Sequence, residues 1–268
     1  MAYYGGFVPG QICYQLTGHA VPAIGHTVTE DDASALSEPV KAILSDTAGI
    51  QEAQEALQDL IKTDFNLSVL EAVLAPQESY EEWRVGEALA QHHLTAQYGY
   101  DFPWPDSRSA RNPNSSSGGV DLIGFTTAQG AAARFVLSEV KTSHQQAWPP
   151  SIATSRSHGL REQVTGLLGA DDRSKWAIRY MTMNSLGKSW HSDFREAMST
   201  YLAEPQKVVV VGVLVHVAKP DVKDLQANAK ALSKVCDPDT VMQLVGLYPA
   251  SGVLPLIVGS AVVVETAA

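Results

Sequence analysis

Two carboxylates and an ammonium group are spaced so that they predict one polar cluster within apolar sequence. The segment LSEVKTS places Glu139 and Lys141 two residues apart, and Asp121 lies in the earlier segment GVDLIGF. Side chains two apart on a strand share a face, so Glu139 and Lys141 are expected to project together. If the two segments pair as a hairpin, Asp121 lies beside Glu139. Burying such groups is costly unless they compensate one another, so the cluster indicates a functional site.

A divalent cation would account for this cluster. The carboxylates of Asp121 and Glu139 and the backbone carbonyl of Val140 are hard oxygen ligands, which suit Mg²⁺ (or Mn²⁺), and Mg²⁺ keeps several waters besides. The ion would polarise a phosphate oxygen and lower the pKa of a bound water. Lys141 would orient that water or stabilise charge on the phosphate. The predicted chemistry is metal-assisted hydrolysis at a phosphate.

Strands and helices around the cluster must position it. Residues 120–125 and 134–142 have a hairpin pattern, joined by the loop TTAQGAAA. We expect a helix from about residue 79 to residue 98, ending near Gly99, and a second helix over HGLREQVTGLLGA. The run KWAIRYMTM that follows reads as a strand. These elements would place the polar cluster in a sheet, with a helix before it and a helix after it.

The flanking regions predict further helices and strands. Residues 30–75 carry apolar residues at three- and four-residue spacing, typical of helices, and Thr29 or Asp31 would cap the first of them. Towards the C-terminus, a helix over VKDLQANAKALSKV lies between apolar runs that we expect to be strands: KVVVVGVLVHVA, TVMQLVGLYPA and LPLIVGSAVVVE. A helix between long apolar strands indicates an α/β sheet covered on both faces.

Charge is distributed unevenly along the 268 residues, whose net charge is −10. Residues 1–80 hold two basic and eleven acidic residues, whereas residues 101–207 hold twelve basic and ten acidic residues. The second segment is compatible with nucleic acid, although it is not the basic footprint of a dedicated DNA-binding protein. No apolar run is long enough for a membrane helix, and two cysteines without a CxxC pair predict neither disulfides nor a zinc site. A cytoplasmic protein is expected.

The motifs resemble the core of the PD-(D/E)XK nuclease superfamily. A Gly-x-Asp followed across a hairpin by Glu-x-Lys assigns Asp121, Glu139 and Lys141 to its signature. Members commonly place a further glutamate on the preceding helix, and Glu87 in EEWRVGEALAQHHL fits that catalytic and metal-binding role. Many also place a glutamine on the helix that follows, and Gln163 in HGLREQVTGLL fits it. The resemblance covers about residues 79–170.

That resemblance implies a fold and an activity. The expected fold is α/β and restriction-endonuclease-like, with a mixed central β-sheet flanked by helices. Residues 1–78 would form an acidic helical N-terminal region, and residues 79–268 the nuclease core, with C-terminal strands completing the sheet. The implied activity is metal-dependent endonuclease cleavage of DNA. The order of motifs is also similar to the nuclease subunit of the Hachiman anti-phage system, which implies a helicase or ATPase partner that docks on the acidic residues 30–82.

Other functions remain open at this point. The fold could serve as a non-catalytic interaction module in which the ion pairs hold the sheet together, or as a stand-alone restriction or repair endonuclease. An exposed cross-strand ion pair is the simplest structural alternative. A small-molecule-binding α/β protein ranks last, since no Gly-rich phosphate loop follows a predicted strand. DNA versus RNA and the oligomeric state are undetermined by the sequence.

Several residues outside the motif carry weaker expectations. His92 and His93 suit helix surface or packing better than metal ligation. His144 and His158 could touch a substrate, and Trp104 and Trp148 could stack on bases or pack within their loops. Phosphate contacts or an ordinary solvated surface are the two interpretations of five basic residues: Arg156, Arg161, Arg173, Lys175 and Arg179.

Overall fold

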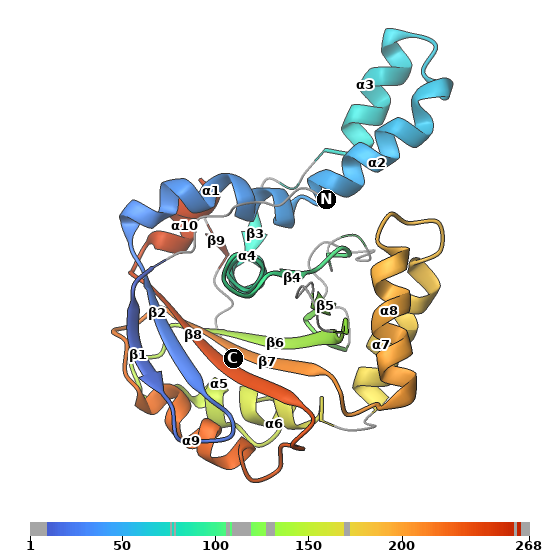
Figure 1. Cartoon of the computed structure of the whole chain (residues 1–268). Coiled ribbons are helices and arrows are strands. Elements are labelled where there is room, and N and C mark those ends of the chain that lie inside the picture. Colours follow the sequence, from blue (N-terminus) through green and yellow to red (C-terminus); the bar gives the residue numbers. More distant parts are fainter. Residues whose placement is uncertain are drawn as a thin grey trace.

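A mixed seven-stranded sheet forms the centre of the molecule in the computed structural model (Figure 1). The residues described by the structure are 10–75, 77, 79–105, 108, 119–126, 132–168, 172–259 and 262–263. The strands of the sheet are β1 (Ile12–Leu16), β2 (Ala23–Val28), β4 (Tyr100–Asp101), β5 (Leu122–Thr126), β6 (Phe135–Ser143), β7 (Val209–His216) and β8 (Val241–Pro249). Their order is β1-β2-β8-β7-β6-β5-β4. The four central strands β2, β8, β7 and β6 are parallel, and the remaining pairs are antiparallel.

Helices cover both faces of this sheet, as expected for an α/β protein. The helices are α1 (Glu30–Leu44), α2 (Thr47–Leu57), η1 (Gln58–Leu60), α3 (Asp64–Val73), α4 (Glu82–Tyr98), α5 (Ser151–Thr154), α6 (Leu160–Thr165), α7 (Asp172–Asn184), α8 (His191–Ala203), α9 (Lys223–Leu232) and α10 (Val253–Val258). Figure 1 shows α1, α4 and α10 on one face and α5, α6 and α9 on the other, with α7 and α8 standing at the β5 end. A separate pair of short strands is formed by β3 (Tyr80–Glu81) and β9 (Val262–Val263).

Strand alternation divides the interior into two apolar cores. On β6, Val136 and Val140 belong to the core beneath α1, α4 and α10. Phe135 and Leu137 belong to the opposite core, beneath α5 to α9. Because successive side chains point to opposite faces, Glu139 lies on the second face, toward α6 and α7. The predicted hairpin is confirmed, since β5 and β6 pair antiparallel.

Two glycines let helices approach the sheet beside this hairpin. A Cβ atom at Gly86 of α4 would lie 2.1 Å from Thr142 Oγ1 of β6. A Cβ atom at Gly212, the β7 partner of Glu139, would lie 2.9 Å from Val164 of α6. Both distances are shorter than van der Waals contact allows. Glycine at these positions therefore lets α4 lie close to β6 on one face of the sheet and α6 lie close to β7 on the other.

The N-terminal region contributes directly to the sheet. Strand β2 pairs parallel with β8, from Ala23 opposite Leu244 to Val28 opposite Pro249, and β1 pairs with β2. Helix α1 packs in the same core as α4 and α10. The segment 1–78 was expected to form an acidic helical region ahead of the nuclease core. In the structure it supplies two strands to the central sheet and one helix to the apolar core.

The helices α2 and α3, with η1 between them, form a helical arm (residues 47–73) that extends away from the body in Figure 1. All residues of α2 and α3 are described, and none of them is buried. At the root of the arm, Arg108 holds Asp46 through two hydrogen bonds of 2.7 Å, and Lys188 lies 2.7 Å from Glu52. The root is therefore tied to the body by ion pairs.

The structure corrects two expected strands. KWAIRYMTM forms most of α7: Ile178 and Met181 are buried three residues apart, whereas Trp176, Tyr180 and Met183 are exposed. This three- to four-residue period is that of a helix with one buried face. The start of LPLIVGSAVVVE forms α10, packed in the core with α1, and only β9 is extended. Helix α8 was not predicted. The expected strands β7 and β8 and the helices α4 and α9 are confirmed.

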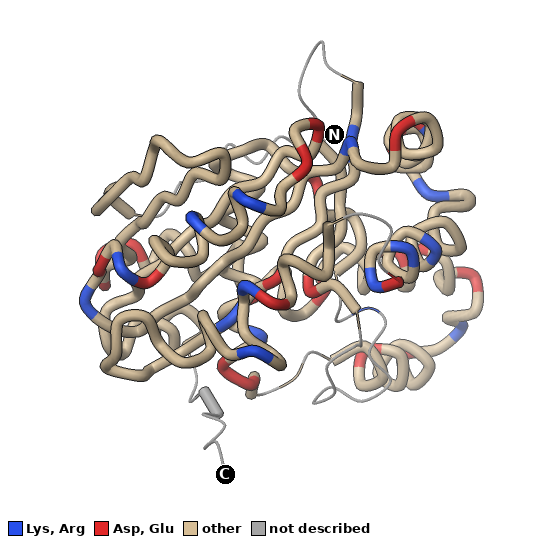
Figure 2. Tube along the Cα trace, turned by 90° about the horizontal axis from the view of Figure 1, so that it is seen from below, with Lys and Arg blue, Asp and Glu red and all other residues tan. Residues whose placement is uncertain are grey.

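Acidic and basic residues are interspersed over the body. Figure 2 shows Lys and Arg positions mixed with Asp and Glu positions along the trace instead of gathered in one broad basic region. Within the described ranges, every helix is too short or too polar to cross a lipid bilayer.

Candidate active site

The structure brings Asp121, Glu139 and Lys141 together, as the sequence predicts. Lys141 Nζ lies 3.7 Å from Asp121 Oδ2 and 3.7 Å from Glu139 Oε2. Asp121 precedes β5, and its Oδ2 accepts a hydrogen bond of 2.8 Å from the backbone N–H of Val140. This bond holds the Asp121 carboxylate against the middle of β6, so that both carboxylates face one ammonium group.

The three side chains differ in their access to solvent. The side chain of Glu139 is 1% exposed, whereas those of Lys141 and Asp121 are 18% and 19% exposed. Glu139 therefore forms the floor of the site, and the other two residues form its rim. A solvated cross-strand ion pair at a sheet edge, the simplest structural alternative, does not describe a carboxylate at this depth.

Arg173 completes the site from the first turn of α7. Its Nη2 atom contacts Glu139 Oε1 and also donates to the carbonyl oxygen of Gly119 at 2.7 Å. Its Nη1 atom donates to the carbonyl oxygen of Gln163 at 3.3 Å. The planar guanidinium group thus links β6, α6 and the segment before Asp121. Sequence reasoning counted Arg173 only as one of several phosphate contacts, because reading the next residues as a strand hid the helix that presents it.

Electrostatics favour a further positive charge beside Glu139. Burial, followed by the negative charge of Asp121, raises the pKa of Glu139 to about 8, although Lys141 and Arg173 act in the opposite direction. Its Oε2 atom is buried and accepts no hydrogen bond from the described residues. A buried carboxylate with an unsatisfied oxygen is costly, so a bound cation would stabilise its ionised form.

The donor set fits Mg²⁺ or Mn²⁺ in part. Asp121 and Glu139 offer carboxylate oxygens. Val140 offers its backbone carbonyl. This carbonyl points to the same side of β6 as the Val140 N–H that binds Asp121. It is not used in the pairing with β5, because that pairing starts at Leu122, opposite Ser138. Among the described residues, no three His, Cys, Asp or Glu side chains gather in a group that could hold a metal. The ion would therefore depend on two carboxylates, one carbonyl and waters, a set that Mg²⁺ accepts.

Glu87, expected as a third carboxylate, does not join this pair. It is half-buried on α4 and lines a small pocket together with Arg84, Gln91 and Leu122. Leu122 belongs to the core beneath α4, on the face opposite to Glu139. The pocket reaches the residue after Asp121, but the three carboxylates do not form one ligand group.

Gln163, the glutamine that the resemblance assigns to the helix after the hairpin, is linked to the site through its backbone. It is on α6, and its backbone carbonyl oxygen accepts a hydrogen bond from the same Arg173 guanidinium group that contacts Glu139. The side-chain Oε1 atom of Gln163 is buried and has no hydrogen-bond partner among the described residues. An unsatisfied buried amide oxygen of this kind is available to a water.

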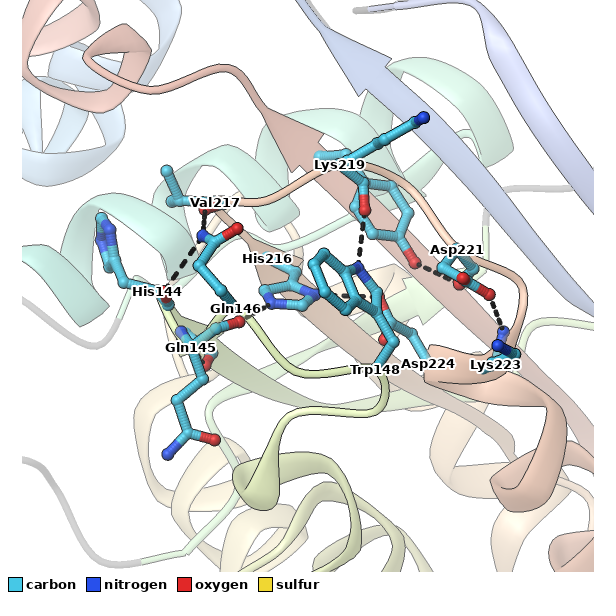
Figure 3. A network of polar contacts seen from close by, with 12 residues as sticks. His144, Gln145, Gln146, Trp148, His216, Val217, Lys219, Asp221, Lys223 and Asp224 are labelled. Atoms are coloured by element: carbon cyan, nitrogen blue, oxygen red, sulfur yellow. Dashed lines mark hydrogen bonds and ion pairs between the residues drawn. The ribbon is translucent and has the colours of Figure 1, made fainter.

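A buried polar network fixes the loop that follows Lys141 (Figure 3). His216 Nδ1 lies 2.8 Å from Asp224 Oδ2, and its Nε2 lies 2.6 Å from the carbonyl oxygen of Gln145. Burial lowers the pKa of His216, but the bonds to Asp224 and Gln145 outweigh it and raise the pKa. Trp148 Nε1 donates to the carbonyl oxygen of Lys219 at 2.8 Å. The loop is therefore anchored to the ends of β7 and α9.

Three of the remaining candidates contact other side chains. His93 packs against His26 in the core, in agreement with the packing expectation. His144 contacts Glu82 of α4, and Trp104 Nε1 donates to the Tyr180 hydroxyl at 2.8 Å.

No protein-family model matches the sequence, and no curated protein sequence matches it at a significant level.

Proposed function

We propose that this protein is a metal-dependent endonuclease of the PD-(D/E)XK type that cleaves DNA. The observation that carries the proposal is the buried Glu139 beside Asp121, with Lys141 at 3.7 Å from both carboxylates. The order helix α4, hairpin β5–β6, helix α6 and parallel strand β7 supports a restriction-endonuclease-like core within the mixed sheet.

Each residue of the site has a task in this proposal. Asp121, Glu139 and the Val140 carbonyl would hold Mg²⁺ or Mn²⁺, which when bound polarises the phosphate and acidifies a water. The Lys141 ammonium group at the rim would orient the attacking water or stabilise charge on the phosphate. Gln163, with its unsatisfied Oε1, would accept a hydrogen bond from that water.

A cleavage assay on supercoiled plasmid tests this function. The wild type should cut in Mg²⁺ or Mn²⁺ and not in EDTA, and Glu139→Gln should lose cutting while remaining folded. Glu204→Gln, which removes a partly exposed glutamate at the end of α8, is the matched control and should cut normally. Cutting by a folded Glu139→Gln protein would exclude this site as the catalytic centre.

A second candidate function has one observation in its favour. Arg173 already compensates Glu139, so the cluster could hold the sheet together in a non-catalytic interaction module. Calorimetric titration with Mg²⁺ separates the two candidates. A nuclease should bind the ion and should lose that binding in Asp121→Asn, whereas a structural cluster should bind no metal.

We also propose that the nuclease acts in anti-phage defence in the cytoplasm, with a helicase or ATPase that docks on the helical arm. The arm exposes six large apolar side chains: Leu57, Leu60, Phe65, Leu67, Val69 and Val73. Residues 47–73 also contain five acidic residues and one lysine. Charge complementarity therefore favours a basic, partly apolar segment of the partner as the occupant.

Changing Phe65 and Val73 together to serine tests that docking surface. The variant should keep the cleavage activity of the isolated chain and lose the stimulation that a partner helicase gives in ATP. Sedimentation of the isolated chain, with and without the two substitutions, gives the oligomeric state. A dimer that this variant breaks would show that the arm binds a second copy instead.

A further inference from the structure

Helix α7 presents an aromatic face to solvent. Trp176 and Met183 are 62% and 70% exposed, and Tyr180, between them on the same helix face, is 38% exposed. The opposite face is buried through Ile178 and Met181. Large apolar side chains at positions i, i+4 and i+7 form a continuous stripe along a helix. A stripe of this kind on the surface indicates a binding site more than a packing defect.

Basic residues accompany this stripe. Lys175 and Arg179 are exposed on α7, and the Arg179 guanidinium carbon lies 5.2 Å from the ring centroid of Trp176. Lys175 also pairs with Asp172 at 3.8 Å, a distance and an exposure at which the pairing contributes little. Residues 172–188 contain four basic residues and one acidic residue, in a chain whose net charge is −10.

The helix that carries the stripe begins beside the candidate active site. Arg173, in the first turn of α7, contacts Glu139 and the carbonyl oxygen of Gly119. From there the 13 residues of α7 extend for about 20 Å at the α-helical rise. One ring is also held in place, because the Tyr180 hydroxyl accepts a hydrogen bond of 2.8 Å from Trp104 Nε1.

We propose that the exposed face of α7 binds a single-stranded nucleic acid and guides it to the Asp121–Glu139–Lys141 site. Trp176 and Tyr180 would stack on bases, and Lys175 and Arg179 would contact phosphates. Stacking on aromatic rings requires unpaired bases, which a duplex does not offer. The proposal rests on the proposed nuclease function, which it deepens by naming the substrate class.

Binding in EDTA tests this surface independently of cleavage. Fluorescence anisotropy is measured with a labelled 20-nucleotide single strand and with the same sequence as a duplex. The single strand should bind more tightly, and Trp176→Ala should weaken its binding about tenfold, the effect of losing one stacked base. Leu202→Ala, an equally exposed apolar residue on α8, is the matched control and should bind like the wild type.

The charged residues are tested by salt dependence. Replacing Lys175 and Arg179 by glutamine should make the plot of log affinity against log salt shallower by about 1.4, since each phosphate contact to a single strand contributes about 0.7. Lys230→Gln, on α9, should leave the slope unchanged. Circular dichroism melting of each variant checks that it is folded.

The outcomes separate this proposal from the nuclease proposal. Trp176-dependent binding of the single strand supports the α7 surface even if no metal yields cutting. Normal binding by a folded Trp176→Ala protein, or equal binding of duplex and single strand, overturns the α7 surface even if the plasmid is cut. If the α7 surface instead binds a protein, Trp176→Ala will not change the binding of the single strand, and the proposal is overturned.

Discussion

The guanidinium group of Arg173 contacts the buried carboxylate of Glu139 across 34 residues of sequence. The same group also donates a hydrogen bond to the carbonyl oxygen of Gln163, so one side chain holds both the floor of the site and α6. The positive charge of Arg173 compensates the carboxylate that we propose as a metal ligand. Arginine and metal ion would then compete for Glu139, and this competition can be measured.

Replacing Arg173 with alanine should destabilise the metal-free protein and make it more responsive to metal. Loss of one partner from a buried ion pair costs several kcal/mol, and the 31% exposure of Arg173 reduces this to about 1–2 kcal/mol. Saturating Mg²⁺ should raise the Tm of Arg173→Ala more than that of the wild type, because the ion then meets no competitor. Equal Tm shifts in both proteins would contradict the competition. Arg195→Ala, an exposed residue of α8, serves as the control.

Lys141→Ala and Asp121→Ala should each reduce plasmid cleavage at least a hundredfold with the fold intact. Lys141 supplies the ammonium group at the rim, and Asp121 supplies a ligand oxygen, so neither variant leaves the site complete. Initial rates in Mg²⁺ are compared with those of Lys230→Ala, which removes an exposed lysine on α9. A folded Lys141→Ala protein that cuts at the normal rate would remove Lys141 from the mechanism.

A pair of buried histidines should make the protein less stable in acid. The rings of His26 and His93 lie 4.5 Å apart between β2 and α4, and no nitrogen of either ring has a hydrogen-bond partner among the described residues. Burial, then the positive charges that His26 and His92 would carry, lowers the pKa of His93 to about 3 from its ordinary 6.5. His93 therefore contributes stability that is present above pH 6.5 and is lost as the pH falls toward 3.

The measurement is denaturant unfolding between pH 7 and pH 4. In His93→Phe, which keeps a ring and removes the proton site, the loss of unfolding free energy should be smaller by about 1.4 kcal/mol for each pH unit below 6. His158→Gln, an exposed histidine, should leave the wild-type slope unchanged. Identical slopes for wild type and His93→Phe would show that His93 takes up its proton without unfolding.

The contact between Gly86 and Thr142 should make glycine necessary on α4. Gly86→Ala places a methyl group 2.1 Å from Thr142 Oγ1, and such overpacking typically costs 1–3 kcal/mol. In a Thr142→Ala background the same substitution should stabilise the protein, since the obstacle is gone and alanine favours the helix by about 1 kcal/mol. Unfolding free energies of the four proteins test this reversal. Additive effects would mean that the two side chains do not meet.

Local spacing in the sequence determined the polar cluster and the elements that carry it. Glu139 and Lys141 share a face because a strand repeats every two residues, and the hairpin brings Asp121 beside them. The helical spacing of residues 82–98 likewise predicted α4, which ends before Gly99 as expected. Such properties depend only on neighbouring residues, so a single sequence is enough to predict them.

Tertiary contacts decided the rest. The apolar residues of α7 read as a strand because Trp176 and Tyr180, which face solvent, look in sequence like Ile178, which faces the core. Helix α10 was misread for the related reason that a short apolar run fits either element. The pairing of Arg173 with Glu139, and the separation of Glu87 from them, depend on which face of the sheet each helix covers. Spacing along the chain cannot specify that arrangement, because it results from the packing of two cores against one sheet.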